Sequence, residues 1–405
     1  MTDAEAGLTA KHRRFAGSRG SGVLYFIAFL GALGYAAVVP LIPFLVLHSG
    51  GNALLGGAVV AVHALMSVCS APWLGRLSDR IGRRTVLALT LTGLVFAYLL
   101  LAYANSLILI FAARILAGVM AGNVGVIQAA LVDSASPERR GGVMSRIMAA
   151  WALGYIAGPA FSAGISMLAP TKDVEIVGFS SAAISLLALC VLWLDPPPEH
   201  SIEAPPSKEG RSAETGGVGA PQMQVLLVLG AASLCVSGLT AITGFWANAV
   251  YGWAERGVSL LLLWVAAAVS GFQGIIMPLM FRKLSPAVLL MGCYLFCGIA
   301  CVSLWLWGHV AVLMGVSVTV LFVGLTAGQS VATTLLSLSA KPADRGRIMG
   351  LGVSAGGLGR VAGPVAFGAL FAHMGANSPF ATVLTVMVVC ALCSVGFASP
   401  SGSAR

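Results

Sequence analysis

Apolar residues run through this chain in long stretches, separated by short segments that carry most of the charged side chains. Stretches of about twenty apolar residues can cross a bilayer as helices, which satisfy their own backbone hydrogen bonds. The pattern predicts an all-α integral membrane protein with twelve transmembrane helices. They cover residues 23–47, 54–74, 85–104, 107–132, 143–168, 175–194, 222–249, 257–281, 286–307, 309–337, 348–373 and 376–398. The first is too long for a signal-peptide core, so we expect it to remain as a span.

Composition supports a membrane protein, because 58% of the residues are hydrophobic and 9% are charged. Ordinary soluble domains carry about 25% charged residues, so a soluble globular enzyme is excluded. The net charge of +9 is explained by basic cytoplasmic loops, and no nucleic-acid partner is expected. Basic residues fill alternate loops, including Arg76, Arg80 and Arg140, whereas the opposite loops carry only Lys172 and Arg256. This asymmetry predicts that both termini are cytoplasmic.

The segment 195–221 is rich in Pro, Gly, Ser and Glu, which predicts a flexible cytoplasmic linker. It separates six-helix bundles at 23–194 and 222–398, with cytoplasmic tails at 1–22 and 399–405. Eight residues recur after a constant offset of 205 positions: Pro137, Arg140, Gly141, Met144, Gly154, Ala157, Gly158 and Pro159. This internal repeat predicts two pseudo-symmetric bundles.

The segment after the second span, Gly75 to Arg84, resembles the loop signature G-x-L-x-D-R-x-G-R-R of the major facilitator superfamily at every fixed position. In that family the loop latches the outward-open state, and Asp133 resembles the carboxylate that pairs with the arginine matching Arg83. We expect the glycines to form a tight turn and Asp79 to accept hydrogen bonds at a helix N-terminus. The predicted cytoplasmic latch comprises Gly75, Asp79, Arg80, Gly82, Arg83, Arg84 and Asp133.

The fifth span carries Gly154, Gly158 and Pro159, which resemble the G-x-x-x-G-P signature of antiporters and recur as Gly359, Gly363 and Pro364. Glycines four residues apart let two helix backbones approach closely, and an internal proline bends the helix. The stretches 40–43 and 61–75 also resemble the drug:proton antiporter branch that includes the tetracycline exporters. This resemblance implies export across a bacterial inner (plasma) membrane.

Proton coupling is less well defined, because the tetracycline exporters carry an acidic residue in the first span and residues 29–39 here have none. All fourteen acidic residues fall in termini, loops or helix ends. The candidates for the proton path are Arg114, Asp133 and His63. On a continuous helix Gly118, Gly125 and Gln128 share a face with Arg114. Arg114 either serves the cavity or proton path, or snorkels to the outer surface.

Arg360 lies near the middle of the eleventh span, where an unpaired cation is costly. Either a substrate anion meets it, or it pairs with backbone carbonyls or a distant acid such as Asp133. The candidate substrate-binding residues are polar or aromatic positions within spans: His63, Asn123, Gln128, Trp151, Tyr155, Trp246, Asn248, Gln273, Gln329 and Arg360. No metal site or cofactor is expected, because the eight cysteines lie in apolar runs without metal-binding partners, and no G-K-[ST] motif exists for ATP.

These features predict a monomeric secondary active transporter that exports an amphipathic, drug-like molecule by alternating access, coupled to protons. The alternative is import or export of an organic anion, such as a carboxylate metabolite or siderophore, recognised by Arg360. A transport-inactive receptor or scaffold is disfavoured, because an intact latch has little use in a static protein.

Overall fold

The computed structural model describes residues 22–133, 135, 140–169, 173–194, 218–308, 310–340 and 344–398. Most of the predicted linker, residues 195–217, and the tails at 1–21 and 399–405 lie outside this part. Within the described residues the chain is helical and contains no strand. The first described helix begins at residue 22, one residue before the predicted start of the first span.

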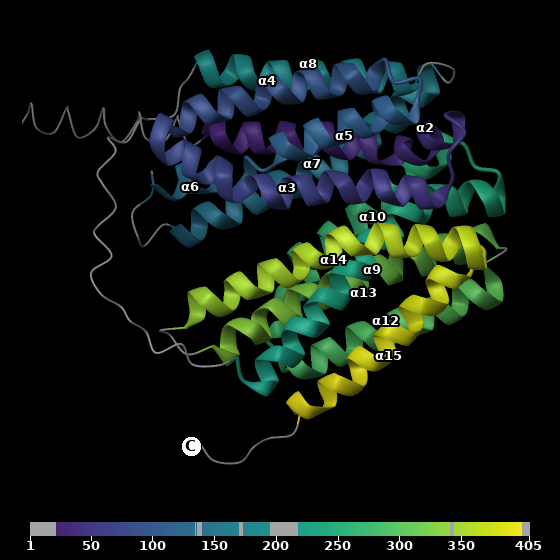
Figure 1. The fold of residues 1–405 in the computed structure, drawn as a ribbon. Coiled ribbons are helices and arrows are strands. Elements are labelled where there is room, and N and C mark those ends of the chain that lie inside the picture. Colours follow the sequence, from purple (N-terminus) through teal and green to yellow (C-terminus); the bar gives the residue numbers. More distant parts are fainter. Residues whose placement is uncertain are drawn as a thin grey trace, which may run out of the picture. The chain divides into compact units, whose positions relative to one another are not determined.

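The first six predicted spans are all present as helices (Figure 1). The first covers Gly22–His48 and ends in the 3-10 turn η1 (Val39–Leu41) and α2 (Ile42–His48). The others are α3 (Ala53–Ile81), α4 (Arg83–Ala102), α5 (Leu107–Ala121) with α6 (Val124–Asp133), α7 (Arg140–Leu168) and α8 (Asp173–Leu194).

The last six predicted spans are also present as helices (Figure 1). They are α9 (Ala220–Tyr251), α10 (Glu255–Gly271) with the π-helical segment η3 (Phe272–Ile276) and α11 (Met277–Phe281), α12 (Pro286–Trp307), α13 (Ala311–Ser339), α14 (Arg345–Met374) and α15 (Ser378–Ala398).

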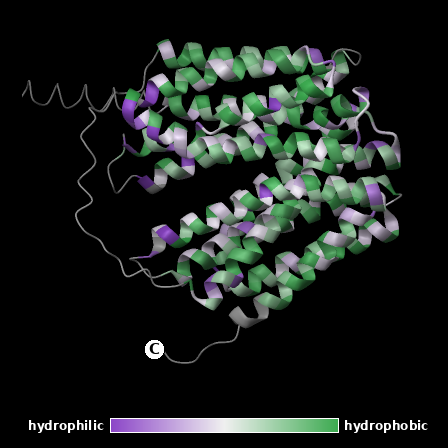
Figure 2. Ribbon diagram, viewed as in Figure 1, coloured by the Kyte–Doolittle hydropathy of each residue, from purple (hydrophilic) through white to green (hydrophobic). Residues whose placement is uncertain are grey.

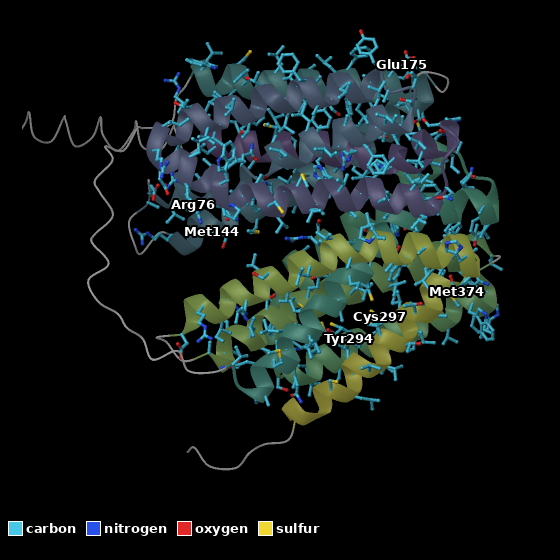
Figure 3. The ribbon with its side chains drawn as sticks, in the orientation of Figure 1. Arg76, Met144, Glu175, Tyr294, Cys297 and Met374 are labelled. Atoms are coloured by element: carbon cyan, nitrogen blue, oxygen red, sulfur yellow. The ribbon has the colours of Figure 1, made fainter. Side chains whose placement is uncertain are left out.

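The hydropathy of these helices confirms the predicted fold class. In the described part, eleven helices are long and apolar enough to cross a membrane, and α15 adds a further apolar helix. Figure 2 shows that hydrophobic residues cover most of the helix lengths, while many hydrophilic residues lie toward helix ends. In the first unit defined below, Figure 3 places Arg76 and Glu175 at opposite ends of the helices.

Two spans that the sequence predicts as continuous are interrupted. The fourth breaks at Gly122 and Asn123, between α5 and α6. The prediction that Gly125 and Gln128 share a helix face with Arg114 assumed an unbroken helix, and this break removes that premise. The eighth span contains the π-helical segment η3 just before Pro278, which has no N–H for an α-helical bond.

The described chain packs as two compact units. Within the described residues, the first comprises 22–41 and 65–194, and the second comprises 42–64 and 218–398. Residues 42–64 belong to the second unit because Pro43, Ala53 and the glycines of α3 pack on α9 and α14. A Cβ atom on Gly56 would meet the ring of Phe245, and one on Gly57 would meet the carbonyl of Pro364. The division into bundles at 23–194 and 222–398 stays a prediction.

Each unit has its own helix pairs. In the first, α4 packs against α5 and α8, and α7 packs closely on the first span. In the second, α9 packs against α13 and α14, and α12 against α13 and α15. The core of the second unit includes Tyr294 and Cys297 on one face of α12, labelled in Figure 3. Cys301 belongs to the same core, and Cys293 packs against it.

Candidate functional site

The predicted latch is assembled around the guanidinium group of Arg83 at the start of α4. Its Nη1 lies 2.9 Å from Asp79 Oδ1, and its Nη2 lies 3.3 Å from Asp133 Oδ2. Arg83 Nη1 also donates to Ser78 Oγ at 2.6 Å, and that hydroxyl donates to the carbonyl of Gly75 at 2.8 Å. Three helices, α3, α4 and α6, are therefore joined at one arginine.

Two details of the latch differ from the sequence prediction. Helix α3 continues to Ile81, so Gly75 lies inside a helix and forms no turn. Asp79 lies near the C-terminal end of α3. Its carboxylate forms an ion pair with the Arg83 side chain instead of capping a helix N-terminus. The turn depends on Gly82 alone, whose φ of 93° favours glycine. Ser78, which is buried, was not predicted, because a serine in a loop signature carries no distinguishing pattern.

Arg84 extends the latch toward the end of α8. Its guanidinium lies 4.7 Å from the ring centroid of Trp193, and Nη2 donates to the Trp193 carbonyl at 3.5 Å. Such a contact combines cation–π attraction with a hydrogen bond. Arg76 and Arg80, by contrast, point to exposed positions on α3. The basic segment therefore holds two arginines in specific contacts and presents two at the surface.

Arg114 lies two turns into α5 and is 1% exposed. Its guanidinium carbon lies 5.6 Å from the ring centroid of Tyr35. None of its three guanidinium nitrogens has a hydrogen-bond partner among the residues that the structure describes. The alternative in which Arg114 snorkels to the surface is therefore wrong, because the side chain is enclosed within the first unit.

The break in the fourth span is fixed by a buried polar pair. Asn123 Nδ2 donates to Thr90 Oγ1 of α4 at 3.0 Å, and that hydroxyl donates to the carbonyl of Leu87. Gly122 lies against α3, where a Cβ would meet Ser70 Oγ and the backbone of Ala71. Asn123 thus holds the interrupted helix in place, and it is not among the residues that line the cavity described next.

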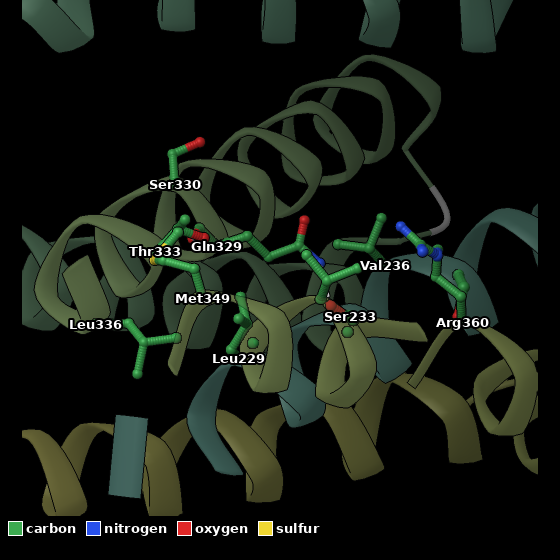
Figure 4. Close-up of a pocket in the computed structure, with 13 residues that line it drawn as sticks. Leu229, Ser233, Val236, Gln329, Ser330, Thr333, Leu336, Met349 and Arg360 are labelled. Carbon is green, nitrogen blue, oxygen red and sulfur yellow. Dashed lines mark hydrogen bonds between the residues drawn. The ribbon is translucent and has the colours of Figure 1, made fainter. Parts of the chain in front are cut away.

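A cavity of about 360 Å³ lies within the second unit, between α9, α13 and α14 (Figure 4). Two of the ten predicted substrate-binding residues, Gln329 and Arg360, line it. The sequence did not single out Ser233, Ser237, Ser330 and Thr333, which supply hydroxyl groups. The apolar wall consists of Leu229, Val236, Leu336, Met349 and Val353, with Gly352 and Gly356 completing the lining.

Among the described residues, one hydrogen bond joins two lining side chains across helices, from Gln329 Nε2 to Ser233 Oγ at 3.0 Å. Ser237 Oγ donates to the carbonyl of Gly359 at 3.1 Å, which joins α9 to α14 next to Arg360. Thr333 and Ser330 donate to carbonyls one turn back on α13. Arg360 is exposed to the cavity, and within the described residues no carboxylate pairs with it.

The other predicted substrate-binding residues lie elsewhere. Trp246 is 3% exposed and packs against Tyr251 and Phe380. Asn248 donates to the carbonyl of Trp253, which caps the end of α9. Tyr155 packs edge-on against Tyr35, and His63 is buried in α3. The remaining residues, Gln128, Trp151 and Gln273, lie on α6, α7 and η3 outside the lining.

The repeated glycines lie in equivalent seams. A Cβ on Gly154 would approach Ala32 and the carbonyl of Phe29, and one on Gly158 would approach Ala36 and Ala37, both in the first span. In the second unit, Gly359 and Gly363 approach the backbone of α9 in the same way. Pro159 and Pro364 lie inside their helices. The seam on α14 also places Arg360, the next residue after Gly359, beside the cavity.

The helix order, the internal repeat and the latch define a multi-pass membrane protein of the transporter class. The chain belongs to the Major Facilitator Superfamily, whose family model matches residues 24–340. It is similar to the tetracycline resistance protein, class D, of Salmonella ordonez, with 27% identity over 352 residues, 86% of this chain and 88% of that protein.

Two solved structures share the fold. The human organic anion transporter MFSD10 matches with a TM-score of 0.66 and 19% identity, over 93% of this chain and 99% of that one. The nucleoside transporter NupG matches with a TM-score of 0.76 and 12% identity, over 94% of this chain and 100% of that one. At 19% and 12% identity, these similarities establish the fold and give no information about the substrate.

Proposed function

We propose that this protein is a secondary active transporter that exports an amphipathic small molecule across a bacterial inner membrane by alternating access, in exchange for protons. The observation that carries the proposal is the three-helix latch, in which Arg83 joins Asp79 and Asp133. Exposed ion pairs contribute little to stability, so a network of this kind is better suited to biasing one conformation over another.

Export is supported by the similarity to a tetracycline resistance protein and by the tight glycine seam between α7 and the first span. A seam without side-chain bulk allows two helices to slide or tilt while water and ions stay excluded. The proposal includes a monomer in the bilayer with both termini in the cytoplasm.

Proton coupling is proposed to use Arg114, with Asp133 and His63 as further candidates. The first span offers no acidic residue, whereas Arg114 places a buried guanidinium beside Tyr35. A fixed charge in a low-dielectric site changes the proton affinity of any group that comes close to it. Arg114 would then act on protons through its field, since an arginine does not itself lose its proton.

The test uses purified protein in liposomes, with tetracycline and ethidium as probes. Accumulation of either compound should depend on an imposed pH gradient, and collapse of that gradient with an ionophore should abolish it. Equal accumulation with and without the gradient would contradict proton coupling. Accumulation of neither compound would contradict the drug-like substrate class.

A second candidate function is import or export of an organic anion that binds at Arg360. The observation that favours it is the position of Arg360 in a cavity of the second unit, without a carboxylate among the described lining residues. The same liposomes, loaded with labelled organic acids, test this candidate, since a gradient-dependent flux of an acid would support it.

A further inference from the structure

In the cavity of the second unit, Arg360 lies at one end, and Met349 lies with Thr333 at the other (Figure 4). Arg360 and Met349 both lie on α14, eleven residues apart, which corresponds to about 16 Å along a helix. Leu336 of α13 lies beside Met349. A molecule that fills this space is therefore elongated, with a polar head at Arg360 and an apolar tail.

The middle of the cavity offers a small amount of hydrogen bonding. The carboxamide nitrogen of Gln329 is bonded to Ser233 Oγ, so the Ser233 hydroxyl keeps its proton as a donor. A Cβ on Gly356 would lie 3.3 Å from that hydroxyl, so glycine keeps the space in front of the pair open. A ligand with one polar acceptor partway along its length can therefore accept a hydrogen bond from the Ser233 hydroxyl.

Charge defines the head group. The acidic residues in the described helices lie at or near helix ends: Asp79, Asp133, Asp173, Glu175, Glu255 and Asp344. None of them lines the cavity. The planar guanidinium of arginine binds carboxylates and similar oxyanions with two parallel hydrogen bonds, which a cation or a neutral amide cannot match.

We infer that this cavity binds an elongated amphipathic monoanion, with its carboxylate or sulfonate at Arg360 and its apolar body against Leu336 and Met349. The inference rests on the transport proposal for its purpose and deepens it by naming the substrate class. The volume of about 360 Å³ equals roughly a dozen water molecules. A small solute fits such a space.

The test measures binding to the purified full-length protein by isothermal titration, with 6-phenylhexanoate as the probe. Its neutral amide and the cation 6-phenylhexylamine are the matched ligands. The anion should bind at least tenfold more tightly than either. A series from 4-phenylbutyrate to 6-phenylhexanoate should gain affinity with length, by up to about fourfold per methylene group.

Variants locate the two ends of the ligand. Arg360→Gln should weaken binding of the anion at least tenfold and leave the amide unchanged, and Arg360→Lys should fall between. Met349→Ser should remove most of the gain with chain length and leave 4-phenylbutyrate unchanged. Arg347→Gln, on the same helix but outside the lining, is the control. Equal affinity for anion and amide, or unchanged anion binding in a folded Arg360→Gln protein, would overturn the inference.

Two further arms separate the sources of failure. Binding is measured without any gradient, so anion binding that depends on Arg360 supports the inference even if proton-driven transport is absent. If the wild-type protein does not bind the anion, and proton-driven ethidium transport survives Arg360→Gln, the transport proposal is supported and the inference is overturned. In nanodiscs, loss of 6-phenylhexanoate binding on adding phosphatidylglycerol would identify a lipid as the ligand and overturn the solute assignment.

Discussion

Arg83 and Asp133 are fifty residues apart in sequence, and their side chains meet at 3.3 Å where α4 begins and α6 ends. Asp79 completes the contact from α3 at 2.9 Å. All three side chains are partly exposed, with relative exposures of 29%, 47% and 62% for Arg83, Asp133 and Asp79. Solvent screening makes such pairs weak as sources of folding stability. Their arrangement across three helices suits a contact that forms and breaks.

Replacing Arg83 by Ala should therefore reduce transport at least tenfold while changing the melting temperature by only a few degrees. Asp79→Asn should have a similar effect, because both remove a contact that biases one conformation. Transport is measured in liposomes and stability by intrinsic tryptophan fluorescence. Arg282→Ala removes an exposed arginine after α11 and is the control. Wild-type transport by Arg83→Ala would show that the latch is not needed for turnover.

The seam between α7 and the first span leads to a second prediction. A Cβ on Gly158 would lie 2.5 Å from the Cβ of Ala36, so a larger side chain must push the two helices apart. Gly158→Leu should abolish transport and lower stability by about 1–3 kcal/mol. Gly164→Leu, on the same helix where a Cβ meets nothing within 4 Å, is the matched control. Equal effects of the two variants would contradict a role for close packing at Gly158.

The helices were predictable from the sequence because a span of apolar residues has one stable form in a bilayer. The break at Asn123 was not, because the apolar run continues through it. That break depends on Thr90, thirty-three residues away on another helix, whose hydroxyl accepts the Asn123 amide. A partner so distant leaves no local pattern in the sequence.

Only part of the cavity was predictable from the sequence. Arg360 and Gln329 stand out because charged and amide side chains are rare inside spans. Ser233 and Thr333 do not stand out, because hydroxyl residues in spans usually donate to their own helix, as Thr240 and Thr319 do here. Only the packing of α9 against α13 and α14 distinguishes the hydroxyls that line a cavity from those that do not.

The Asn123–Thr90 pair itself leads to a third prediction. Thr90→Val leaves the Asn123 amide buried without its partner and should lower stability by about 1–3 kcal/mol. The double variant with Asn123→Leu should cost less than the sum of the two single variants, since they share one hydrogen bond. Thr92→Val is the control, because Thr92 donates to the carbonyl of Ala88 on its own helix. Strict additivity in thermal melts would show that the two side chains are not coupled.

Arg114 provides the last prediction, because its burial separates a structural role from a role in coupling. An enclosed guanidinium without a hydrogen-bonding partner in the described chain costs stability, so Arg114→Met should melt at the same temperature as the wild type or higher. Arg146→Met, which removes an exposed arginine from α7, is the control.

If Arg114 acts on protons, Arg114→Met should lose accumulation driven by a pH gradient while it still exchanges labelled for unlabelled substrate without a gradient. The two measurements use the same liposomes, so they share protein amount and orientation. Arg114→Lys should keep part of the gradient response, since it keeps a positive charge beside Tyr35. Marked destabilisation of Arg114→Met would assign the residue to structure. Intact gradient-driven accumulation in a stable Arg114→Met protein would remove Arg114 from the proton path.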